Sequence, residues 1–101
     1  MNIGQAIKLC RTGRGLSQAD LARQAECSVS YLSMLENNKR DPTLSTVTRI
    51  AHALQVPVGL IFFVGAEGSD LVGIDRALQG ELARTALELI NEPINKQRSV
   101  L

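Results

Sequence analysis

The chain has 101 residues, a length that suits one small domain with an appendage. Apolar residues make up 45% and aromatic residues only 3%, without tryptophan, so the core must consist of Leu, Ile, Val and Ala. Such a core favours packed helices, and we expect an all-α fold. The net charge of only +1 is, by itself, weak evidence against a nucleic-acid partner.

The charge is distributed unevenly along the chain. Residues 1–64 carry seven basic and four acidic residues, a net charge of +3, whereas residues 65–101 carry four basic and six acidic residues, a net charge of −2. The first part is therefore the candidate for binding a polyanion, and the second part is not.

Hydrophobic periodicity predicts a first helix with apolar residues at Ile3, Ile7 and Cys10. This helix should end at Thr12–Gly13, where glycine can adopt the left-handed conformation. A third helix should stop at Asn37–Asn38. The second to fifth helices are each expected to begin at a capping residue or a proline, namely Ser17, Ser28, Thr43 and Pro57.

The segment 65–68 is rich in small residues and is predicted to be a linker. After it, Ser69 and Asp70 can cap a sixth and longest helix that runs to about Asn91, where Pro93 stops it. We expect the tail 93–101 to be frayed, because it shows no clear period.

Other sequence features point away from membranes, metals and catalysis. No apolar run approaches the ~18–20 residues that span a bilayer, and the first residues lack the pattern of a signal peptide, so we expect a cytoplasmic protein without a membrane partner. Cys10 and Cys27 have no metal-ligand spacing and are expected to be reduced core thiols. The only histidine, His52, is expected to be exposed. No catalytic constellation can be assembled, so we expect neither an enzyme nor a cofactor.

The stretch SQADLARQAECSVSYLSMLENNKR places two short amphipathic helices very close together. A turn of three or four residues leaves two helices crossing at a steep angle, as in the helix-turn-helix motif. Ala22 is small where the helix backbones approach, Glu26 lies in the turn, and Leu32 and Leu35 anchor the second helix. The opposite face of that helix is then free to enter a groove and consists of Val29, Ser30, Ser33 and Met34, with Tyr31 at its margin.

From IGQAIKLCR through LSQADLARQA and SYLSMLENNKRDPTL to TRIAHALQVP, the first 62 or so residues resemble the Xre-like or lambdoid repressor and Cro class of helix-turn-helix regulators. The resemblance implies a five-helix repressor-like domain over residues 1–64 that binds double-stranded DNA. The chain departs from this class at two positions where glycine is usual, Glu26 and Asn38. Both would need the left-handed conformation, which asparagine tolerates better than glutamate.

The resemblance also implies roles for individual residues. The residues expected to face bases are Gln18, Val29, Ser30, Ser33 and Met34. The residues expected to contact phosphates are Ser17, Tyr31, Asn37, Asn38, Lys39, Arg40 and Arg14. Arg11 is expected to form a structural ion pair with Glu36. Because Arg, Asn and Gln are missing from the middle of the third helix, direct readout should be modest, with Gln18 and DNA shape contributing more to discrimination.

The sixth helix, 69–92, is predicted to form a homodimer. Leu9 and Leu60 are apolar where the class is usually polar, and the apolar stripe of the sixth helix is wider than one small domain needs. The expected interface residues are Leu60, Phe63, Leu71, Ile74, Leu78, Leu82 and Leu89.

Two alternatives to this dimer remain open. The sixth helix can fold back over its own subunit, and Gly73 and Gly80 argue against a long coiled coil. It can also hold a different protein, in which case the chain is a protein-binding module of the antitoxin or antirepressor type with secondary DNA binding.

Overall fold

The computed structural model describes residues 1–92 and 94, and these residues form helices without any β-strand, which confirms the all-α fold. The elements are α1 (Ile3–Gly13), α2 (Gln18–Gln24), α3 (Val29–Glu36), α4 (Leu44–Leu54), α5 (Val58–Gly65), a short 3₁₀ helix η1 (Gly68–Leu71) and α6 (Arg76–Asn91). The expectation of a frayed tail concerns residues 93–101, which lie outside the described residues except for Ile94.

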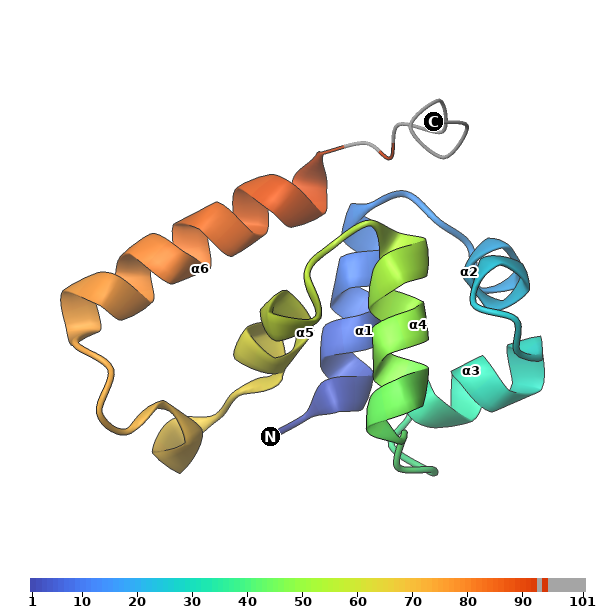
Figure 1. Cartoon of the computed structure of the whole chain (residues 1–101), viewed down its shortest axis with the longest axis horizontal. Helices are drawn as coiled ribbons and strands as arrows, with labels where there is room; N and C mark the ends of the chain where they lie inside the picture. Colours follow the sequence, from blue (N-terminus) through green and yellow to red (C-terminus); the bar gives the residue numbers. More distant parts are fainter. Residues whose placement is uncertain (93, 95–101) are drawn as a thin grey trace.

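The first five helices surround one hydrophobic core. α1 is central, because it packs against α3, α4, α5 and α6. Figure 1 shows α1 and α4 side by side, with α2 and α3 on one flank and α5 on the other. The largest side chains that are completely buried are Ile7, Cys10, Leu21, Leu32, Leu35, Val47, Ile50, Leu54 and Ile61. This core carries the α2–α3 pair as a rigid unit.

Three predicted helix starts are confirmed by side-chain capping. The hydroxyl oxygens of Ser17, Ser28 and Thr43 accept hydrogen bonds from the backbone N–H groups three residues further on, at 3.0, 3.0 and 3.1 Å. Each bond satisfies one backbone donor that the first helical turn leaves unpaired. The start of each of these helices is thus fixed by a local bond.

Four helices end in the same way, with a left-handed residue that closes the last turn. The residues are Gly15, Glu26, Asn38 and Gln55, with φ angles of 76°, 59°, 58° and 57°. At each, two backbone N–H groups return to carbonyls of the last turn in the Schellman pattern, as in the bonds from Cys27 to Ala22 and from Lys39 to Met34, both 2.9 Å.

The prediction that Gly13 adopts the left-handed conformation is therefore wrong, because Gly15 adopts it instead. Gly13 remains helical and is needed for space, since a Cβ atom there would collide with Ile90 of α6.

The segment between α5 and α6 differs from the sequence prediction. Gly65 is not part of a linker: it is the last residue of α5, it is buried, and its carbonyl accepts a 2.7 Å hydrogen bond from the Asn2 N–H. Ser69 and Asp70 lie in η1 instead of starting α6, because the Asp70 carboxylate accepts the Glu67 N–H at 2.9 Å and closes the short turn locally. Helix α6 begins only at Arg76, after Gly73 at φ 93°.

One end of α6 is docked on the domain. In Figure 1 its C-terminal end lies beside the C-terminal ends of α1 and α4, whereas its N-terminal end extends beyond α5. Ala86 and Ile90 are buried, but Leu78, Leu82 and Leu87 are exposed by 47%, 39% and 54%. The C-terminal half of α6 thus packs on its own subunit through Ala86 and Ile90, while Leu78 and Leu82 in the N-terminal half stay uncovered.

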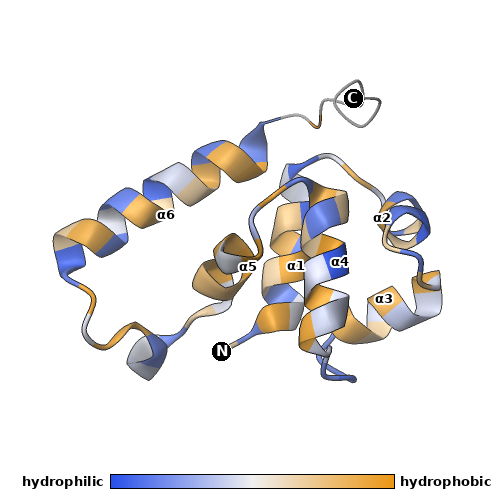
Figure 2. Cartoon of the chain, in the orientation of Figure 1, coloured by the Kyte–Doolittle hydropathy of each residue, from blue (hydrophilic) through white to orange (hydrophobic). Residues whose placement is uncertain are grey.

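The two helices at the C-terminal end of the described chain differ in hydropathy. Figure 2 shows α5 as almost entirely hydrophobic and α6 as a mixture of hydrophobic and hydrophilic positions. Among the described residues, no single helix has the length and apolarity needed to cross a membrane; α4 and α5 reach that threshold only as a pair bent by 107°.

Candidate nucleic-acid interface

The turn between α2 and α3 sets the angle of the exposed helix. Leu21 and Ala22 of α2 and Leu32 of α3 are completely or almost completely buried. Glu26 adopts the left-handed conformation that the position requires, and its side chain is exposed. A non-glycine residue there costs roughly 1–2 kcal/mol in backbone strain, which the packing on both sides of the turn must offset.

The residues expected to read bases lie on the outer face of α3. Val29 is exposed by 44% and Ser30 is exposed, while Ser33 and Met34 are half-buried. Tyr31 lies at the margin of this face and packs against the core. This face presents the hydroxyl groups of two serines, which can bond to base edges, and the apolar side chains of Val29 and Met34, which can contact thymine methyl groups.

A buried carboxylate holds the end of α3 to α1 and α2. The Arg11 guanidinium donates to both Glu36 oxygens, from Nε to Oε2 at 2.7 Å and from Nη2 to Oε1 at 3.0 Å. Its Nη1 also donates to the Leu16 carbonyl at 2.9 Å. The ion pair expected between Arg11 and Glu36 is therefore present, and it ties three elements together through charge-assisted bonds.

Gln18 belongs to the same network. Its Nε2 donates to Glu36 Oε1 at 3.0 Å, so the amide is oriented before any ligand binds. The sequence contained no sign of this bond, because the two residues are 18 positions apart and neither spacing nor composition links them. The side-chain amide oxygen of Gln18 remains available as an acceptor for a donor group on a ligand.

The residues expected to contact phosphates form an exposed loop after α3. Asn37, Asn38, Lys39 and Arg40 are all exposed, and Ser17 is exposed at the start of α2. The Arg40 guanidinium lies 5.8 Å from the centre of the Tyr31 ring, a distance that suits a cation–π contact.

The two asparagines of the loop form hydrogen bonds with other parts of the domain. Asn37 donates to the Ser33 carbonyl at 2.8 Å, and Asn38 donates to the Asn2 side chain at 3.0 Å. These bonds hold the loop to α3 and to the residue before α1, and they leave the side chains of Lys39 and Arg40 exposed.

Arg14 does not lie on this surface, which corrects its expected role as a phosphate contact. Its side chain is buried and donates to backbone carbonyls at the ends of two other helices: Nε to Leu54 at 3.0 Å, and Nη1 to Leu89 at 2.8 Å and Glu92 at 2.7 Å. Carbonyls at a helix C-terminus carry partial negative charge, so a guanidinium is well placed there. Arg14 fastens α6 to the domain.

The cysteines and the histidine lie where the sequence predicted. Cys10 is completely buried, and burial raises the pKa of its thiol to about 11. Cys27 is half-buried against the core, and burial raises its pKa as well. Both thiols are therefore neutral near pH 7. His52 is exposed on α4.

An exposed short helix, joined to its partner by a tight turn and flanked by a basic loop, is the arrangement of a helix-turn-helix motif. A sequence model of the helix-turn-helix family matches residues 7–61, and the chain belongs to this family. This membership confirms the resemblance to the class of Xre-like and lambdoid repressors.

Known relatives support this assignment. The chain is 43% identical over 67 residues to the immunity repressor protein of Bacillus phage phi105, an alignment that covers 66% of this chain and 45% of the repressor. It is 31% identical over 93 residues to the HTH-type transcriptional regulator DdrOP3 of Deinococcus deserti, covering 92% of this chain and 67% of that protein. It is 34% identical over 70 residues to the regulator RamB of Mycobacterium tuberculosis, covering 69% of this chain and 14% of RamB. The chain thus spans less than half the length of the phage repressor.

Proposed function

We propose that the chain represses transcription by binding a pseudo-palindromic DNA operator as a homodimer. The observation that carries the proposal is the outer face of α3, which is exposed next to a Gln18 amide fixed by the buried Glu36 carboxylate. Similarity to a phage immunity repressor supports repression as the outcome of binding. Because the α3 face lacks Arg, Asn and Gln, a single copy would bind weakly, and two copies would add their contacts.

An apolar cleft between α5 and α6 supports the dimer. The cleft has a volume of about 360 Å³, and Leu60, Phe63, Leu82 and Leu89 line it together with small residues. These four residues belong to the set expected at a dimer interface. Of the remaining three, Leu78 is exposed on α6, and Leu71 and Ile74 are half-buried before it.

A second copy is the occupant we propose for this cleft, because a two-fold axis can place Leu78 and Leu82 of each α6 against the cleft of the other subunit. The two α3 helices would then reach successive major grooves about 34 Å apart, which predicts operator half-sites roughly 10 or 11 base pairs apart or a multiple of that.

The test compares two leucines of the same helix. Leu82→Glu places a charge in the cleft, whereas Leu87→Glu places the same charge on an exposed position outside it. By sedimentation equilibrium at micromolar concentration, the unchanged chain and Leu87→Glu should be dimers and Leu82→Glu should be a monomer with weakened operator binding.

The proposal of a dimer is contradicted if the unchanged chain is a monomer that binds its operator as one copy. A monomer that shows no specific gel shift by itself contradicts the whole proposal and favours the protein-binding alternative.

A further inference from the structure

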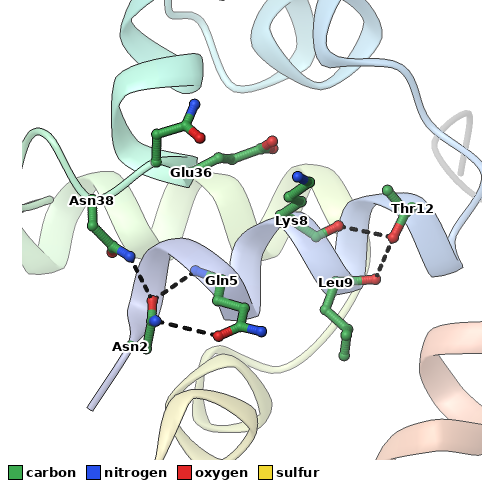
Figure 3. Close-up of a pocket in the computed structure, with 8 residues that line it drawn as sticks. Asn2, Gln5, Lys8, Leu9, Thr12, Glu36 and Asn38 are labelled. Carbon is green, nitrogen blue, oxygen red and sulfur yellow. Dashed lines mark hydrogen bonds between the residues drawn. The ribbon is translucent and has the colours of Figure 1, made fainter.

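A polar cleft beside the recognition surface has no role in the function proposed so far. It has a volume of about 490 Å³ and lies between α1 and the C-terminal end of α3. Gln5, Lys8 and Thr12 line it from α1, and Glu36 and Asn37 line it from α3 and the following loop. Figure 3 shows the Lys8 side chain rising from α1 toward the α3 wall, where Glu36 lies.

The cleft is continuous with the candidate interface. Glu36, which forms part of its wall, is the residue that holds the Gln18 amide, and Asn37 begins the basic loop. A DNA strand that places a base edge near Gln18 would therefore pass its backbone over this cleft. Polar groups at this location would contact the DNA backbone. Such contacts position the DNA but do not distinguish between bases.

The charge balance of the cleft favours an anion. The Glu36 carboxylate is neutralised by the Arg11 guanidinium, which donates two hydrogen bonds to it. Lys8 is exposed, and the four ion pairs found among residues 1–92 and 94 do not include it. The local excess is therefore one positive charge, and it belongs to Lys8.

We propose that this cleft binds one phosphate group of the DNA backbone and that Lys8 supplies the positive charge. The inference rests on the proposed function, since it adds a contact from α1 to the interface formed by α2, α3 and the loop. Lys8 gives each subunit a further phosphate contact, from α1, next to the loop that carries Lys39 and Arg40. It strengthens binding to all sequences alike and adds to the salt dependence.

The test measures DNA affinity by fluorescence anisotropy at several salt concentrations. Each neutralised phosphate contributes about 0.9 to the slope of log affinity against log salt, so Lys8→Ala should reduce the slope by about 0.9 per subunit. At low salt its affinity should fall by about two- to fivefold, equally for specific and unrelated duplexes. Lys8→Arg keeps the charge and should keep the slope.

Arg84→Ala is the matched control, because it removes the same charge from an exposed position on α6. Its slope should equal that of the unchanged chain. The inference is overturned if Lys8→Ala keeps the unchanged slope, or if Arg84→Ala loses as much slope as Lys8→Ala. If the unchanged chain binds no DNA, the proposed function itself is contradicted. If the chain binds DNA and Lys8→Ala keeps the unchanged slope, only the phosphate contact in the cleft is contradicted.

Discussion

Replacing Arg11 by methionine tests whether the buried carboxylate network holds the recognition surface. In the Arg11–Glu36 pair the side chains are exposed by only 11% and 2%, so the change leaves a buried negative charge with Gln18 as its remaining side-chain partner. Breaking a buried ion pair costs about 3–5 kcal/mol, and the Leu16 carbonyl also loses its donor. With a loss of about 4 kcal/mol, the melting temperature should fall by roughly 15–30 °C.

The double variant Arg11→Met with Glu36→Leu distinguishes this explanation from a simple loss of contacts. Removing both charges avoids the uncompensated carboxylate, so the free energy of unfolding should recover by at least about 2 kcal/mol relative to Arg11→Met alone. Urea denaturation followed by circular dichroism measures it. The double variant should still bind its operator less specifically, because the Gln18 amide has lost its anchor. If the losses of the two single variants simply add in the double variant, the reasoning about a buried charge is refuted.

Three further predictions concern the turn, the reading face and the core thiol. Glu26→Gly should raise the free energy of unfolding by about 0.5–1 kcal/mol in thermal melts, because glycine adopts φ 59° without strain; an unchanged or lower stability would contradict the strain at this turn. In selections from random duplexes, Ser33→Ala or Met34→Ala should change the preferred bases, whereas Lys39→Ala should weaken all sequences about equally; the reverse pattern would remove α3 as the reading helix. Because its pKa is raised to about 11, the Cys10 thiol should resist alkylation at pH 8 in the folded protein and react in urea; rapid reaction of Cys10 in the folded protein would contradict its burial.

Local signals predicted most of the helix boundaries. Ser17, Ser28 and Thr43 cap the helices that they were expected to cap, because a capping hydroxyl acts on a backbone group only three residues away. Glu26 and Asn38 adopt the left-handed conformation that the resemblance required of them. The exposed face of α3 followed from the positions of Leu32 and Leu35, which the core requires.

What the sequence did not reveal depends on distant partners. Arg14 bonds to carbonyls 40 or more residues away, so its charge suggested a surface contact that tertiary packing excludes. The capping signal at Ser69 and Asp70 is genuine but is used by a 3₁₀ turn, and α6 starts later. Gly13 faces Ile90, which no local pattern indicates.

The central claim, sequence-specific DNA binding by this chain, is tested most directly by one salt titration. A duplex selected from a random library and a scrambled duplex of the same composition are each titrated with the purified chain between 50 and 200 mM salt. The account predicts markedly tighter binding to the selected duplex, together with a steep loss of affinity for both duplexes; if a dimer neutralises six or more phosphates, that loss is about 10³-fold. Equal affinity for the two duplexes, or affinity that does not change with salt, would contradict the account.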